Sequence, residues 1–95
     1  MKRILIADDH ETVRSGLRAV VEGRAGWEVV AEARDGKEAV AGAFDTRPDV
    51  AIIDHEMPFM TGIEVARRIR EHQQTTEILI FTMHDSEVLA LQAFR

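Results

Sequence analysis

The fold is indicated by one short stretch near the N-terminus, Ile4-Leu5-Ile6-Ala7-Asp8-Asp9. Four consecutive apolar residues are typical of a strand that is buried on both faces of a parallel sheet. The two carboxylates stand where such a strand would leave the core. Comparable apolar runs occur at 50–53 and 78–81, and residues 27–33 are also typical of a strand. We therefore expect four buried strands.

Helical patterns separate these runs. Apolar residues recur at helical spacing over 11–22. Two residue pairs, Asp35 with Glu38 and Thr61 with Glu64, have the spacing of capping boxes and predict helices that begin there. A fourth helix is expected from Asp85, with apolar residues at Val88, Leu89 and Phe94.

The alternation of strands and helices predicts an α/β fold. Such an order implies parallel strands, right-handed crossovers and helices on both faces of the sheet. The sequence stops at Arg95, inside the predicted fourth helix. The expected architecture is a doubly wound parallel sheet with four strands and four helices, in one domain over 1–95.

Composition excludes several classes of protein. Lys and Arg number 12 against 17 Asp and Glu, so the formal net charge is −5, which argues against a self-sufficient nucleic-acid binder. Cys is absent, which excludes disulfide scaffolds and thiolate zinc sites. No apolar run approaches the roughly 20 residues that span a bilayer, and the N-terminal run is too short for a signal peptide. We expect a cytoplasmic location.

Acidic residues follow two of the predicted strands. Asp8 and Asp9 end the first strand and Asp54 ends the third, while Thr82 ends the fourth. Ligands of such sheets bind outside the carboxyl ends of the strands. Carboxylates brought together there repel unless a cation or a proton neutralises them, and hard oxygen ligands suit Mg²⁺. A single Asp after a strand is often a helix cap, and Asp9 taken alone fits that role as well.

The sequence resembles the receiver domain of two-component response regulators, in the subfamily whose receivers precede a helix-turn-helix domain. The matching stretches are Ile4–His10, Pro48–Asp54, Met57-Pro58 with Met60 and Gly62, and Phe81–Asp85. The resemblance covers the whole chain. It implies a flavodoxin-like sheet with strand order 2-1-3-4-5.

The resemblance also implies roles for individual residues. Asp54 matches the aspartate that accepts phosphate, and Thr82 matches the hydroxyl residue that contacts the phosphoryl group. Asp8 and Asp9 match the acidic pair that holds Mg²⁺, with Asp9 as a direct ligand. Glu56 stands where the family contributes a backbone carbonyl to the metal. A sensor histidine kinase is the implied phosphate donor, and the chain itself is not expected to be an enzyme.

The family pattern continues past Arg95 with a fifth strand, a lysine and a fifth helix, so we expect an incomplete fold. Without the fifth strand, the apolar segment 77–82 would become an exposed edge, which predicts a homodimer through that edge or through the fourth helix. No direct nucleic-acid or membrane binding by this chain is expected.

Two alternatives stay open at this stage. A degenerate receiver would bind protein partners without phosphorylation. A small Mg²⁺-dependent phosphatase would use Glu56 as a second acid two residues after the nucleophile. A nucleotide-binding function lacks the Gly-rich loop that should follow the first strand.

Overall fold

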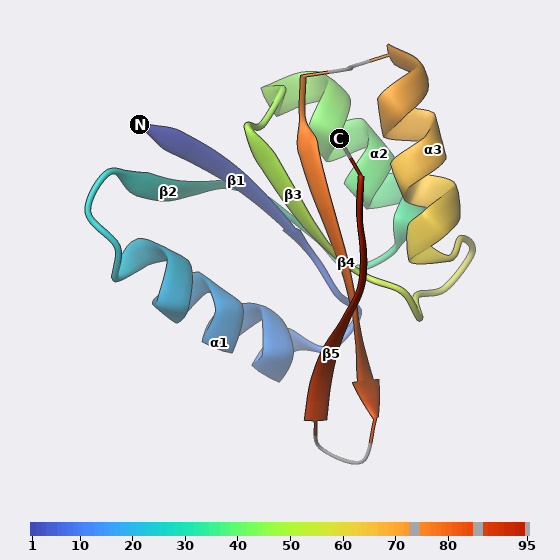
Figure 1. Ribbon diagram of the computed structural model, residues 1–95, viewed down its shortest axis with the longest axis horizontal. Helices are drawn as coiled ribbons and strands as arrows, with labels where there is room; N and C mark the ends of the chain where they lie inside the picture. Colours follow the sequence, from blue (N-terminus) through green and yellow to red (C-terminus); the bar gives the residue numbers. More distant parts are fainter. Residues whose placement is uncertain (73–74, 85–86, 95) are drawn as a thin grey trace.

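The computed structural model describes residues 1–72, 75–84 and 87–94. Its elements follow one another in the order β1 (Lys2–Ala7), α1 (Glu11–Glu22), β2 (Trp27–Ala33), α2 (Gly36–Thr46), β3 (Val50–Asp54), α3 (Gly62–His72), β4 (Glu77–His84) and β5 (Glu87–Phe94). The strands form one sheet in the order β2-β1-β3-β4-β5 (Figure 1). Strands β1 to β4 are parallel to one another, which confirms the predicted doubly wound α/β fold.

The helices cover both faces of this sheet. Figure 1 shows α1 on one face and α2 with α3 on the other. Alternate residues of β1 are divided between the two faces, since Ile4 and Ile6 pack with Val21 of α1, whereas Leu5 and Ala7 pack with the core beneath α2 and α3. These four residues of β1 are all fully buried. The continuous apolar run is therefore explained by burial on two faces.

Both predicted helix caps are present, and the cap at Thr61 forms the full reciprocal box, whereas the Glu38 carboxylate reaches back to Arg34 and not to Asp35. Asp35 Oδ1 accepts the backbone N–H of Glu38 at 2.8 Å, and the Glu38 carboxylate accepts the N–H of Arg34 at 2.9 Å. Thr61 and Glu64 exchange reciprocal bonds at 3.2 and 3.4 Å. These contacts satisfy free N–H groups at the helix starts, so α2 and α3 begin where the sequence predicts.

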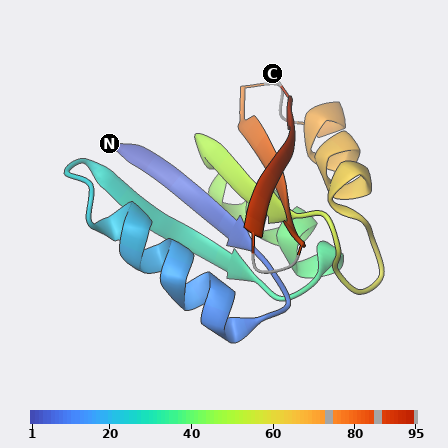
Figure 2. The same ribbon diagram turned by 60° about the horizontal axis from the view of Figure 1, so that its bottom comes forward.

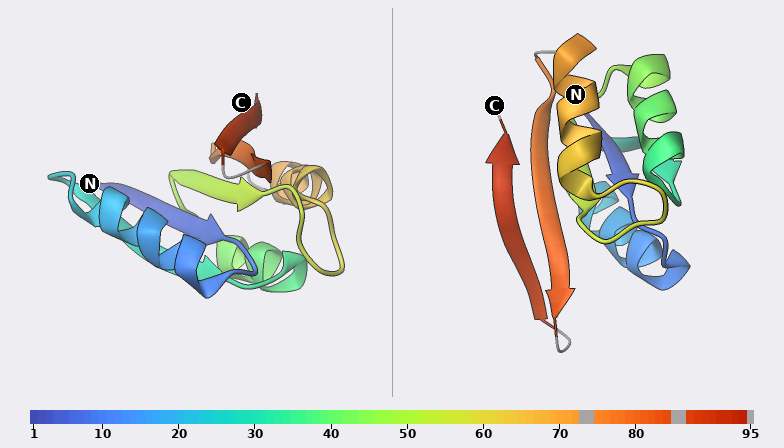
Figure 3. Two further views of the ribbon diagram at one scale, coloured as in Figure 1. Left: turned by 90° about the horizontal axis from the view of Figure 1, so that it is seen from below. Right: turned by 90° about the vertical axis from the view of Figure 1, so that its right-hand side faces the viewer.

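The predicted fourth helix is wrong. Residues Glu87–Phe94, which include Val88, Leu89 and Phe94, form strand β5 instead, and β5 pairs antiparallel with β4. The proposed cap at Asp85 lies outside the described residues. Strands β4 and β5 run side by side along the margin of the sheet (Figure 3). The fifth strand that was expected to be missing is thus supplied from within the chain, in the reverse direction.

Strand β5 also corrects the expected dimer contact. The edge of β4 is paired with β5 over Ile78–His84, so segment 77–82 is not an exposed edge. The structure therefore removes both of the contacts predicted for a homodimer, because the fourth helix is absent from the described residues as well. Self-association itself stays a prediction.

We predict that Ile53→Ala lowers the free energy of unfolding by about 2–5 kcal/mol, because Ile53 is fully buried beneath α2 and α3 and its removal leaves a cavity. Val20→Ala serves as the control, since Val20 is 68% exposed and its truncation should change stability by less than about 0.5 kcal/mol. Urea unfolding measures both. Equal effects of the two substitutions would contradict the assigned core.

Candidate functional site

The carboxyl ends of β1 and β3 meet at one edge of the sheet (Figure 2). Because the two strands are parallel neighbours, the residues that follow them, Asp8 after β1 and Asp54 at the end of β3, are brought together. Ligand atoms of Asp8, Asp9, His10 and Asp54 all lie within 4.8 Å of one another. The carboxylates that the sequence singled out therefore form a single cluster.

The members of this cluster differ in exposure. Asp8 is fully buried and Asp54 is 4% exposed, whereas Asp9 and His10 are open to solvent. Asp9, His10 and Asp54 line a hollow of about 390 Å³. Its other wall comes from the loop between β3 and α3, through Glu56, Met57 and Pro58. A small anion or a hydrated cation has room to reach Asp54 from this side.

Hydrogen bonds satisfy only part of the cluster. Asp8 Oδ1 accepts the backbone N–H of His10 at 2.7 Å and lies 3.0 Å from its Nδ1. Asp8 Oδ2 is buried and has no hydrogen-bond partner among the described residues. Asp54 Oδ1 accepts the N–H of Glu56 at 3.2 Å. A buried carboxylate oxygen without a partner is costly, so the site is suited to a cation that would satisfy it.

His10 was not predicted as part of the site. Its Nδ1 lies 3.0 Å from Asp8 Oδ1 and 3.1 Å from Asp9 Oδ1. The hydrogen bond with Asp8 raises the pKa of His10, and the negative charges of Asp9 and Asp8 raise it further. Its position directly after the acidic pair was visible in the sequence, but spacing alone does not show that the ring turns back towards both carboxylates.

Burial raises the pKa of the Asp54 carboxyl to about 6. The N–H of Glu56 opposes this shift, and the neighbouring charges of Asp8 and Asp9 reinforce it. The carboxyl is thus mostly ionised at neutral pH, but ionisation in this environment is more costly than in water.

The other predicted site residues are placed as follows. The side chain of Glu56 is exposed and its backbone N–H bonds Asp54. Thr82 lies within β4, one residue beyond Phe81, which pairs with Asp54 in the parallel register. Strand β4 therefore continues past the predicted end at Thr82. The backbone of His55 bonds Phe81 and Gly62, which makes His55 part of the frame beneath the loop.

A glycine whose role the sequence did not reveal lies at the foot of this frame. A methyl group at Gly62 would lie 2.9 Å from the Asp54 carbonyl oxygen and 2.9 Å from His55 Cα. Only a residue without a side chain allows α3 to begin this close to β3. The Gly62 N–H also donates to the His55 carbonyl at 2.9 Å, which closes the base of the loop.

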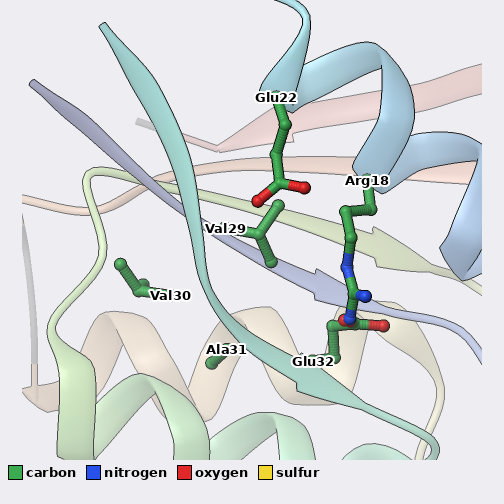
Figure 4. A pocket seen from close by; sticks show the side chains of 6 residues that line it. All are labelled: Arg18, Glu22, Val29, Val30, Ala31 and Glu32. Carbon is green, nitrogen blue, oxygen red and sulfur yellow. The ribbon is translucent and has the colours of Figure 1, made fainter.

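A second hollow of about 290 Å³ lies between α1 and β2 (Figure 4). Arg18 of α1 reaches Glu32 of β2 there, and Arg14 contacts the same carboxylate at 3.4 Å. The remaining lining residues shown are Glu22, Val29, Val30 and Ala31. The ion pairs of Arg14 and Arg18 with Glu32 join α1 to the sheet beside this hollow.

Comparisons with known proteins agree with this arrangement. The response regulator receiver domain family matches residues 4–95. The transcriptional regulatory protein YxjL of Bacillus subtilis is 38% identical over 93 residues, which cover 98% of this chain and 43% of that protein. Response regulator UvrY of Escherichia coli is 36% identical over 89 residues, covering 94% of this chain and 41% of UvrY.

Solved structures show the same likeness. A LuxR-family two-component response regulator from Aurantimonas superimposes with a TM-score of 0.83 at 45% identity, covering 90% of this chain and 61% of the other. The receiver domain of AraT, a response regulator from Geobacillus stearothermophilus, superimposes with a TM-score of 0.81 at 36% identity. The match covers 88% of this chain and 66% of the AraT domain chain.

The chain belongs to the response regulator receiver domain family. Members of this family are signalling modules of two-component systems and are typically not enzymes. The chain spans less than half the length of the two relatives from Bacillus and Escherichia. Among the described residues, no helix has the length and apolar character needed to cross a membrane.

We predict that the metal-free protein loses stability as the pH rises from about 4 to above 6, through the raised pKa of Asp54. Its ordinary pKa is 3.8 and its folded pKa is about 6, so the folded state binds the proton more tightly. The stabilisation is complete below the unfolded pKa and is lost as the pH passes the folded one. Asp54→Asn should remove this dependence.

Thermal unfolding in the presence of a chelator tests this prediction. Asp54→Asn should melt a few degrees above wild type at pH 7.5, and the difference should shrink towards pH 4.5. Asp45→Asn, a change at an exposed carboxylate of α2, is the matched control and should follow the wild-type profile. Parallel profiles for wild type and Asp54→Asn would contradict the assigned burial cost.

Proposed function

We propose that this chain is a Mg²⁺-dependent phosphoacceptor, in which Asp54 takes a phosphoryl group from a phosphohistidine of a sensor kinase. The observation that carries the proposal is the position of Asp54. It lies at the end of β3, faces a hollow open to solvent, and belongs to a group whose ligand atoms lie within 4.8 Å. Membership of the receiver family supports the same assignment.

The residues present fit a magnesium ion. Asp8, Asp9 and Asp54 offer hard oxygen ligands, and the buried Oδ2 of Asp8, without a partner among the described residues, needs a cation or a proton nearby. We assign the metal to these three carboxylates together with the backbone carbonyl of Glu56. Imidazole is a poorer match for Mg²⁺, so His10 is not included. When bound, Mg²⁺ would neutralise charge on the phosphoryl group and on the nucleophile.

The chain's own residues would act as follows. The ionised Asp54 carboxylate attacks phosphorus in line with the leaving group; a bond forms from Asp54 oxygen to phosphorus as the bond to the donor nitrogen breaks. The Glu56 N–H donates to Asp54 Oδ1 and holds that oxygen in place, while the other carboxylate oxygen attacks. Met57 and Pro58 wall the hollow on the opposite side and limit how a donor approaches.

Thr82 is proposed to contact the transferred phosphoryl group. Its register places it one residue beyond the partner of Asp54 on the neighbouring strand, and it is half-buried. A hydroxyl at that point can donate a hydrogen bond to a phosphoryl oxygen. Thr82 pairs with Leu89 of β5, and the residue before it, Phe81, pairs with Asp54 of β3, so the backbone around Thr82 is held by both neighbouring strands.

The relatives' names extend the proposal to the longer proteins that carry such domains. YxjL is a transcriptional regulatory protein, and the Aurantimonas relative is a LuxR-family response regulator. We propose that this chain serves as the receiver part of a transcription regulator and that phosphorylation of Asp54 controls its output.

Asp54→Asn should abolish phosphate uptake while the fold stays intact, because the substitution removes the nucleophile. Wild type incubated with Mg²⁺ and a small acyl phosphate should gain the mass of one phosphoryl group in intact-mass spectra, whereas Asp54→Asn should gain none. Asp45→Asn is the control and should behave as wild type. If wild type gains no mass, the chain is better described as a degenerate receiver that binds partners without phosphorylation.

Mg²⁺ should stabilise wild type by mass action, since only the folded chain brings Asp8, Asp9 and Asp54 together. A millimolar dissociation constant would give about 1–2 kcal/mol of stabilisation at ~10 mM metal. Asp9→Ala should lose most of this response, whereas Asp45→Ala should keep it. An unchanged response in Asp9→Ala would mean that Asp9 is not a metal ligand; a helix cap is not the alternative, because the N-cap of α1 is His10 and α1 has no side-chain cap.

A further inference from the structure

The loop between β3 and α3 contains a strained turn beside the acidic hollow. Phe59 has a φ of 75°, and the Met60 N–H donates to the Pro58 carbonyl at 2.9 Å, which together describe a γ-turn of the positive-φ kind. A bulky residue rarely adopts this conformation and pays a free-energy cost to do so. Such a turn persists only where neighbouring contacts hold it.

Those contacts come from the first turn of α2. The Gly36 N–H points at the Pro58 carbonyl, with a long N···O distance of 3.5 Å, and the Lys37 ammonium lies 5.1 Å from the centre of the exposed Phe59 ring. Gly36 itself is buried against Met60. Three successive residues of the loop are thus contacted by two residues of α2.

The contact at Gly36 leaves no room for a side chain. A methyl group there would lie 2.6 Å from Met60 Cβ, 3.1 Å from Met60 Cγ and 3.2 Å from Val65 Cγ2. Carbon atoms pack at about 3.5–4.0 Å. The position of a Cβ atom is fixed by its backbone, so Met60 cannot rotate out of the way. Either the loop or the helix must move.

Of the two, the β3–α3 loop would move and helix α2 would stay in place. Helix α2 is fixed by its Asp35 cap and by buried Ala39 and Ala43, which pack in the core. Pro58 and Phe59 are exposed. The same loop carries Met57 and Pro58 in the wall of the hollow, and it includes Glu56, whose N–H bonds Asp54. Movement at Met60 is therefore transmitted towards the carboxylate.

We propose that Gly36 is a positioning residue for the phosphoacceptor site, because its missing side chain lets the first turn of α2 hold the β3–α3 loop against Asp54. This inference rests on the proposed function of Asp54. Gly36 does not line the hollow and acts through Met60, Pro58 and Glu56.

The test substitutes Gly36→Ala and compares it with Gly42→Ala. Gly42 lies in the same helix, but a methyl group there would meet the flexible end of Leu5 at 3.3 Å, which can turn aside. We expect Gly36→Ala to raise the Mg²⁺ dissociation constant about tenfold, as outer-shell substitutions at metal sites do. Phosphate uptake from a small acyl phosphate at saturating Mg²⁺ should slow as well, while Gly42→Ala leaves both within about twofold.

A readout without metal separates positioning from general damage. The amide signal of Glu56 in the metal-free protein should shift in Gly36→Ala and stay in place in Gly42→Ala, because only the first displaces the loop. Gly36→Ala combined with Met60→Gly should bind Mg²⁺ as Met60→Gly alone does, since the clashing Cβ is then absent. Such non-additivity is the signature of direct contact.

Each outcome decides the inference. Gly36→Ala that binds Mg²⁺ and accepts phosphate as Gly42→Ala does would overturn the positioning role and leave the proposed function intact. If Gly36→Ala fails to fold, the double variant decides, because a folded double variant supports the contact with Met60 and an unfolded one overturns it. If wild type neither binds Mg²⁺ nor accepts phosphate, the proposed function fails, and the positioning role fails with it.

Discussion

Three carboxylates are held together at the carboxyl edge of the sheet, and Asp8 among them is fully buried. In the metal-free chain this charge is moderated in two ways, since Asp54 holds its proton more tightly and His10 lies between Asp8 and Asp9 with a raised pKa. Both shifts favour the protonated form of the group, so the site favours positive charge. A divalent cation would supply it more completely, because it could satisfy the buried Asp8 oxygen as well.

Much of this cluster follows from the sequence because strand ends are easy to locate. A run of four apolar residues before Asp8 fixes where β1 leaves the core, and parallel pairing of β1 with β3 then places Asp54 beside it. The helix cap at Asp35 and the capping box at Thr61 also formed as predicted. These features are local, or follow from topology rules that apply to every such sheet. The turn of His10 back to two carboxylates and the close approach at Gly62 depend on loop geometry, which residue spacing does not encode.

For segment 87–94, in contrast, the structure that was predicted from the sequence is wrong. Its residues are mostly apolar, and a short apolar run fits a helix or a strand equally well by periodicity. The neighbouring strand, β4, decides which of the two structures forms. The apolar residues 78–81 of β4 would present unpaired N–H and C=O groups at the sheet margin, and β5 pairs with them. The need of this edge for a partner could be predicted from the sequence, but the prediction that a second chain meets it is not what the structure shows, since β5 of the same chain pairs with β4. Tertiary pairing within the chain satisfies the same need, and local propensity is a weak guide against it.

The β3–α3 loop joins an electrostatic constraint to a steric one. Asp54 is bonded by the Glu56 N–H, and this bond favours the ionised carboxylate against the cost of burial. The loop that supplies the N–H is closed at one end by Gly62 against His55 and is held further along by α2 against Met60. Both contacts require glycine. A positive φ at Phe59 costs about 1–3 kcal/mol, and it lets the chain turn between these two fixed points. The N–H that bonds the carboxylate thus belongs to a loop that packs against a helix whose own residues do not line the hollow.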